Sequence, residues 1–241
     1  MHDVKWTRLC GTLALSLGLE QVCHGAFVSL QVTNITNNND GLSEYAIYAV
    51  FDAPTDELLS IFDANISTTT GFFHNTLAGK GASAMPFTTA ELAVSDNPDA
   101  DSFVTIGLDT GDGNNLMLDP LFDENEFISG STLGTNAGWF VFPDNDQGVA
   151  GPRRQVLIAV FTPTNDVAGH AGIVSGTLTL TYDDSPGPGL PVFVDASFIT
   201  PAPGALGLLA LAGLGGRRRR RPRGHFQSAG SVHARALRLR A

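Results

Sequence analysis

Short segments in which apolar and polar residues alternate follow one another along most of the chain. Val28, Leu30 and Val32, for example, are separated by single polar residues, the period of a strand with one buried face. Residues 44–51 are apolar at nearly every position, as in a central strand covered on both sides. Read in this way, the chain contains eight predicted strands, at 28–32, 44–51, 58–62, 102–108, 138–142, 155–162, 173–182 and 191–198.

Helical periodicity is nearly absent between residues 26 and 200. The closest approach is the segment 88–94, which predicts one or two helical turns. Eight strands without intervening helices, joined by loops rich in Asn, Asp, Gly and Pro, predict an all-β fold, an antiparallel β-sandwich of jelly-roll or immunoglobulin-like type. The stretch 65–100 has few strand signals and is either a long loop or a pair of weak strands. Residues 183–189 predict a turn between the last two strands.

An apolar run precedes the predicted strands. Lys5 and Arg8 stand before the run 9–19, and small residues follow near position 25, a layout typical of a secretory signal peptide over 1–25. The run is too short to cross a hydrocarbon layer about 30 Å thick as a helix. Both cysteines of the chain lie in this segment, so a mature chain that begins at residue 26 has no disulfide and depends on its core, or on a metal, for stability.

A second apolar segment follows the predicted strands and has three parts. A Pro-containing tetrapeptide leads into the uncharged apolar segment 205–216, and a block of arginines follows it. The positive-inside rule expects this order in a C-terminal anchor whose end stays in the cytoplasm. Twelve residues give about 18 Å of helix, so snorkelling arginines must supply the remaining length. The residues that define the pattern are Pro201, Ala202, Pro203, Gly204, Arg217, Arg218, Arg219, Arg220 and Arg221.

This three-part end resembles the PEP-CTERM sorting signal of bacterial surface proteins, in the Pro-Ala-Pro-Gly variant of planctomycete exported proteins. The resemblance covers residues 201–221, with Ala202 where the commonest motif has Glu. It implies an exosortase-like transpeptidase as partner, transient membrane insertion through the C-terminal helix, and transfer or release of the rest of the chain at the cell surface. Residues 222–241, which lack acidic side chains, are expected to form a disordered tail. The sequences of residues 48–52 and 101–107 resemble segments of uncharacterised planctomycete exported β proteins. This resemblance implies no activity.

The charge of the chain is divided between two regions. Residues 26–203 hold 22 acidic side chains against Lys80, Arg153 and Arg154, a net charge of −19, whereas residues 217–241 hold nine arginines and no acid. Contacts to phosphates need a basic face on the folded domain itself. The composition therefore excludes a nucleic-acid-binding domain.

Sequence motifs for catalysis are absent from residues 26–200. This segment has two histidines and no cysteine, and it lacks a nucleophile elbow, a zinc-protease motif and a phosphate loop. His74 follows two phenylalanines and is expected at the edge of the core or in a loop, and His170 lies in a predicted turn. A pair of catalytic carboxylates cannot be singled out among 22 acids. The sequence predicts a protein that is not an enzyme.

Two acidic loops flank the strand predicted at 102–108. Calcium takes six to eight oxygen ligands, and these loops offer oxygens at short spacings, with glycines that allow tight turns. Neither loop has the EF-hand order, and the same residue types form ordinary turns, so a calcium site and plain acidic turns both remain open. The candidate ligands are Asp96, Asp99, Asp101, Asp109, Asp112, Asn114 and Asp119, and residues 144–146 form a third acidic segment.

The strand predicted at 138–142 carries three aromatic residues. Because neighbours in a strand point to opposite faces, we expect Phe140 and Phe142 to pack inward and Trp139 to face outward, where it could stack on a ligand.

Three functions are compatible with these observations. The first is a non-catalytic exported protein of the cell surface or extracellular matrix, sorted by its C-terminal signal and attached to envelope or extracellular polysaccharide. The second is a carbohydrate-binding or adhesion module that uses Trp139 and the acidic loops. The third is a secreted hydrolase.

Overall fold

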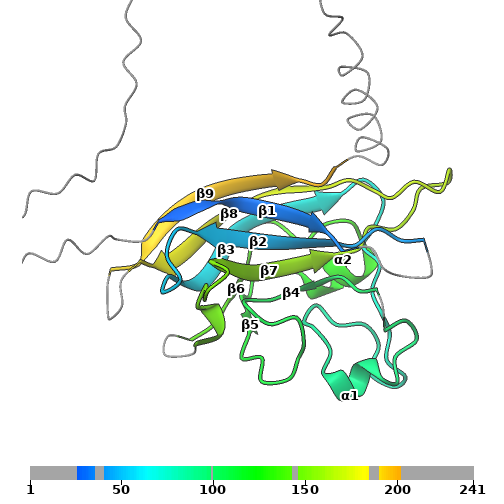
Figure 1. The fold of residues 1–241 in the computed structure, drawn as a ribbon. Coiled ribbons are helices and arrows are strands. Elements are labelled where there is room, and N and C mark those ends of the chain that lie inside the picture. Colours follow the sequence, from blue (N-terminus) through cyan, green and yellow to red (C-terminus); the bar gives the residue numbers. More distant parts are fainter. Residues whose placement is uncertain (1–25, 36–40, 99, 143–145, 185–189, 202–241) are drawn as a thin grey trace, which may run out of the picture. The chain divides into compact units, whose positions relative to one another are not determined.

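The computed structural model describes residues 26–35, 41–98, 100–142, 146–184 and 190–201. These residues form two antiparallel sheets with few helices (Figure 1). The four-stranded sheet has the order β1 (Phe27–Asn34), β2 (Tyr45–Phe51), β7 (Gln155–Phe161) and β4 (Phe103–Val104). The five-stranded sheet has the order β5 (Met117–Leu118), β6 (Ala137–Phe140), β3 (Glu57–Thr68), β8 (Val174–Asp183) and β9 (Val192–Ile199). The helical elements are α1 (Thr89–Leu92), α2 (Glu124–Ser129) and the 3-10 turn η1 (Asp146–Gly148).

The all-β prediction is confirmed, and each of the eight predicted segments contains a strand. The structure extends β3 to Thr68 and reduces β4 to two residues. Beyond β4 the chain still follows β7, because the backbone N–H groups of Thr105 and Gly107 donate to carbonyls of β7 at 3.0 and 2.8 Å. The two-residue strand β5 was not predicted, because so short a segment shows no alternation.

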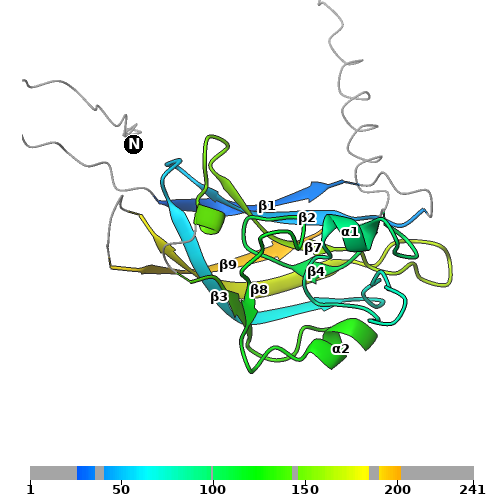
Figure 2. The same cartoon turned by 90° about the horizontal axis from the view of Figure 1, so that it is seen from below.

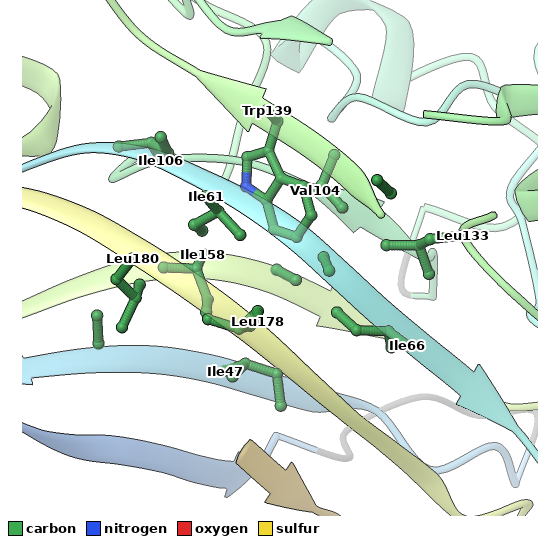
Figure 3. Packing of buried hydrophobic residues seen from close by; sticks show 14 of the residues in the cluster. Ile47, Ile61, Ile66, Val104, Ile106, Leu133, Trp139, Ile158, Leu178 and Leu180 are labelled. Atoms are coloured by element: carbon green, nitrogen blue, oxygen red, sulfur yellow. The ribbon is translucent and has the colours of Figure 1, made fainter. Parts of the chain in front are cut away.

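The main core is built by side chains from both sheets. Ile47 of β2 and Ile158 of β7 meet Ile61 of β3, Leu180 of β8 and Trp139 of β6, and all five are at most 1% exposed (Figure 3). The other face of β2 is covered at Ala46, but Tyr48 and Val50 on that face are half-buried, so the predicted cover on both sides is confirmed only in part. There, Ala46 belongs to a small second cluster, whose other buried members are Phe103, Leu157 and Val160.

The two sheets approach each other at one edge, where β1 lies alongside β9 (Figures 1 and 2). Strand β9 ends at Ile199, and the next residue is tied to the start of β8. The backbone N–H of Thr200 donates to the Val174 carbonyl at 2.8 Å, and the N–H of Val174 donates to the Thr200 hydroxyl at 2.9 Å. The contact pattern divides the chain directly after Thr200 into two units.

The stretch between β3 and β4 is a long loop with one short helix, so the alternative of two weak strands is wrong for the residues described there. Helix α1 lies where the segment 88–94 predicted a turn. Thr88 caps it and Glu91 completes a capping box, an arrangement that satisfies free N–H groups of the first turn. Helix α2, which the sequence did not predict, buries only Phe127. A single buried residue gives no helical period to detect.

In the described parts of the chain, no helix has the length and apolar character needed to cross a membrane. The predicted signal peptide, the apolar segment 205–216 and the tail 222–241 lie outside the described residues, as does most of the turn predicted at 183–189.

Candidate functional site

Most of the predicted acidic ligands that the structure describes are engaged in local hydrogen bonds, whereas Asp109 lines a hollow of about 230 Å³ together with Asp101. Asp112 accepts from the backbone N–H of Thr89 at 2.8 Å and from its hydroxyl at 2.5 Å, which holds the start of α1 and keeps the pKa of Asp112 below its usual value. Asp119 accepts from the N–H of Leu121 at 2.8 Å. These are the bonds of Asp residues that cap helices and turns.

Asp96 and Asn114 of the predicted set have similar roles. Asp96 accepts from the hydroxyl of Thr76, and the Asn114 side-chain oxygen accepts from Leu116 N–H at 3.0 Å and from Gln147 at 2.7 Å. Among the residues described, no group of three or more His, Cys, Asp or Glu side chains is placed to hold a metal ion. The candidate calcium ligands that the structure describes therefore do not form a cluster of three or more carboxylates. Asp99 and Asp144 lie outside the described residues.

Asp101 is not a loop ligand but part of a buried polar pair. It is 6% exposed, its Oδ1 accepts from the N–H groups of Asn75 at 2.9 Å and Ser102 at 2.8 Å, and His74 Nδ1 lies 3.8 Å from the same oxygen. His74 Nε2 lies 3.0 Å from the Phe127 carbonyl, so that nitrogen carries the proton. Burial raises the pKa of Asp101 to about 7 and lowers the pKa of His74.

The prediction that Trp139 faces solvent is wrong. Its side chain is fully buried, and its indole N–H donates to the Thr105 carbonyl at 3.0 Å. The β6 register places Trp139 opposite Ile61, on the core face, and Phe140 opposite Ser60, on the other face. Alternation predicted that Trp139 and Phe140 point to opposite sides, but it could not tell which side is the core. The larger area of Trp139 was the only signal in the segment that favoured burying it.

The face of the five-stranded sheet that points away from the core carries a row of apolar and hydroxyl side chains. We call this row, formed by residues directly opposite one another on the five strands, the aromatic row. Its members are Met117, Phe140, Ser60, Thr181 and Phe193.

Aromatic side chains adjoin this row. The rings of Phe62 and Phe193 lie 6.0 Å apart and those of Phe140 and Phe142 lie 5.9 Å apart, both at steep angles. Phe193 is 62% exposed and Phe142 is 58% exposed. Large apolar side chains with this exposure, gathered on one face, are typical of an interaction surface.

A hollow of about 360 Å³ lies along the aromatic row, lined in part by Ser60, Thr181, Phe140, Asp119 and Pro191. Although Thr181 points to the outer face, it is only 7% exposed, and its hydroxyl has no hydrogen-bond partner among the described residues. A buried hydroxyl without a partner is uncommon in native structures.

Polar rows continue along the same face. Thr179 donates to Asp195 at 2.7 Å across β8 and β9. The next rows pair Asn65 with Thr177 and Ser197, and Ser67 with Ser175 and Ile199. The outer face thus has an aromatic end and a hydroxyl-rich end.

The charges on this face have one sign. Asp63 and Asp195 line a second hollow of about 500 Å³, and Asp119 lines the hollow at the aromatic row. Among the described residues, the three Lys and Arg side chains lie elsewhere, Lys80 paired with Glu91 of α1 and the two arginines in the turn before β7. The face therefore repels anions.

Comparisons with protein families, with curated proteins and with solved structures found no match to this chain. Of the residues predicted to direct sorting, only Pro201 is described. Ala202, Pro203, Gly204 and the arginines 217–221 lie outside the described residues, so their roles remain predictions.

Proposed function

We propose that this chain is an exported, non-catalytic protein of the cell surface or extracellular matrix, sorted by a PEP-CTERM-like signal at its C-terminus. In this proposal the two antiparallel sheets form a β-sandwich of jelly-roll or immunoglobulin-like type that is carried outside the cell. A signal peptide over residues 1–25 starts the export, and an exosortase-like transpeptidase recognises the membrane-anchored precursor.

The position of the sorting pattern supports this proposal most directly. The pattern begins at Pro201, one residue after the compact unit ends. The last strand is already tied in place by the two hydrogen bonds between Thr200 and Val174. Cleavage in the tetrapeptide 201–204 would leave both of these bonds intact, as a processing site requires.

The assignment of a non-catalytic role rests on the two histidines of residues 26–200. His74 is buried beside Asp101 and Phe127, and His170 lies in an exposed turn, where Asp166 accepts from its backbone N–H at 2.9 Å. A general base must reach a substrate within hydrogen-bond distance, but the His74 side chain is only 3% exposed, and the His170 ring lies on the surface beside Asp166.

Two sets of variants in the native host test the sorting proposal. Replacing the arginines 217–221 by Ser removes charges that each cost about 3 kcal/mol to move toward the bilayer centre, so we expect the uncut chain in the exported fraction. Replacing Pro203 and Gly204 by Ala should instead leave the chain in the membrane and block its maturation. Normal processing of both sets of variants would contradict the proposal.

A second candidate function, a carbohydrate-binding or adhesion module, is favoured by the outer face of the five-stranded sheet. The module was predicted around Trp139, which is buried, and around the acidic loops, in which Asp96, Asp112 and Asp119 make local hydrogen bonds. The exposed phenylalanines and hydroxyl rows of the outer face offer a different surface for the same function. A secreted hydrolase has no comparable observation in its favour.

A further inference from the structure

We propose that the aromatic row and the phenylalanines beside it form the contact surface for an uncharged polysaccharide. This inference rests on the second candidate function and gives it a location and a ligand class. The surface is an extended face rather than a closed pocket. With strands about 4.8 Å apart, a row across five strands spans about 19 Å, which suits a polymer chain lying across the strands better than a single sugar.

The exposed rings supply the apolar part of the contact. Sugar rings present C–H groups on their faces, and these pack on aromatic side chains while the hydroxyl groups at the ring edge stay available for hydrogen bonds. Phe193 and Phe142 are the most exposed rings of this face, at 62% and 58%. Each is supported from the side by a second ring, Phe62 or Phe140, at about 6 Å. The rings are therefore held in place before a ligand arrives, which lowers the entropy cost of binding.

The side chains between the rings supply hydrogen-bonding groups. Ser60 and Thr181 lie in the row between Phe140 and Phe193. The Thr181 hydroxyl is buried without a partner among the described residues, and a ligand hydroxyl that reaches the hollow would satisfy it. Farther along the face, the pair formed by Thr179 and Asp195 and the row through Thr177 and Ser197 offer further donors and acceptors.

The charge of the face selects among possible occupants. The carboxylates of Asp63, Asp119 and Asp195 line its hollows, and the described Lys and Arg side chains lie elsewhere. An acidic polysaccharide would be repelled, and so would a second copy of a domain whose net charge is −19. An uncharged polymer meets neither penalty, which is why we assign the surface to a neutral glycan.

The test measures binding of the full chain to two immobilised probes, hydroxyethylcellulose as a neutral polymer and alginate as an anionic one. Salt is kept at about 0.15 M, where charges still act over about 8 Å, and alginate binding is compared between the wild type and the phenylalanine variant, Phe142→Ser, Phe193→Ser, because both carry the same C-terminal arginines. We expect saturable binding to hydroxyethylcellulose and no alginate binding that depends on the two phenylalanines. The phenylalanine variant should bind hydroxyethylcellulose at least tenfold more weakly. Val94→Ser, Val167→Ser is the matched control, because it removes two exposed apolar side chains from loops elsewhere, and it should bind as the wild type does.

A third variant tests the hydrogen-bonding part of the surface. Thr181→Val keeps the shape of the side chain and removes the unpartnered hydroxyl, so the fold should be at least as stable as that of the wild type. We expect it to bind hydroxyethylcellulose several-fold more weakly. Unchanged binding by Thr181→Val would remove this hydroxyl from the contact surface.

Four results would overturn the inference. The first is that the wild type does not bind hydroxyethylcellulose, and the second is that the phenylalanine variant binds it as well as the wild type does. The third is that the valine control loses as much binding as the phenylalanine variant. The fourth is a wild-type dimer that the phenylalanine substitutions dissociate and the valine substitutions do not. The last would make the face an interface between copies of the chain. None of these results bears on sorting, which the processing variants test in the host, so the two proposals can fail separately.

Discussion

Burial assigns different roles to aromatic residues that are close neighbours in the sequence. Trp139 is fully buried in the core (Figure 3). Phe142, three residues later, is 58% exposed. Truncation of the two side chains should therefore cost different amounts of stability. The sequence predicted that Phe142 packs inward and Trp139 faces outward, which is the reverse of the observed arrangement.

We expect Trp139→Ala to lower the free energy of unfolding by about 3–5 kcal/mol, because it leaves a large cavity and an unpaired Thr105 carbonyl. Phe142→Ala should change it by less than about 0.5 kcal/mol. Urea denaturation of both variants measures the difference. A larger loss for Phe142→Ala than for Trp139→Ala would contradict the assignment of the core.

The buried pair of His74 and Asp101 predicts a pH dependence of stability. Burial raises the pKa of Asp101 from 3.8, the usual value of an aspartate, to about 7 in the folded state. The folded state therefore holds this proton more tightly, and the contribution of Asp101 to stability falls as pH rises from about 4 to 7. His74 has a lowered pKa, so its contribution falls as pH drops below about 6.5. The two slopes oppose each other in mildly acid solution.

Asp101→Asn separates these two contributions. An Asn oxygen can still accept from Asn75 and Ser102, but it does not titrate. We expect the melting temperature of this variant, relative to that of the wild type, to increase as pH rises from 4 to 7. His74→Gln is the complementary control and should remove the loss of stability on the acid side. A pH-independent difference between Asp101→Asn and the wild type would show that Asp101 keeps its ordinary pKa in the folded protein.

Among the secondary-structure elements, the positions of the strands along the chain were predicted better than the pairing and register between them. Alternation located β1 and β9 closely, because each has one buried face. It could not locate β5 or α2, which are too short for a period. It also could not place Phe140, Ser60 and Thr181 in one row, because that row depends on the register between strands far apart in the sequence. For this reason, the arrangement of side chains on the outer face could not be predicted from the sequence.

Contacts between elements also decide what a glycine can tolerate. Gly107, just after β4, has φ of +83°, and a Cβ there would lie 1.8 Å from the Gln147 carbonyl oxygen in η1. Gly113 has φ of +72° and open space around it. Gly113→Ala should cost about 1–2 kcal/mol from backbone strain alone, and Gly107→Ala should cost clearly more because η1 must move. Equal losses in urea denaturation would show that the segment at Gly107 and η1 are not packed together.

At the scale of the whole molecule, an acidic domain stays folded although like charges repel. Several described carboxylates, such as those of Asp101, Asp112 and Asp119, accept hydrogen bonds from backbone N–H groups. Among the described residues, no cluster of carboxylates is suited to a metal. We therefore expect the melting temperature in excess EDTA to equal that in calcium. A ligand that binds only the folded state raises stability with its concentration, so a calcium-dependent rise would show a metal site and revive the prediction for the acidic loops.

The central claim is that the chain is exported and processed at its C-terminal signal. Intact-mass measurement of the protein from surface and extracellular fractions of its native host tests this claim most directly. We predict a chain that begins at Ala26 and ends within the tetrapeptide 201–204. A mature chain that still contains residues 205–241 would contradict processing, and a full-length chain confined to the cytoplasm would contradict export altogether.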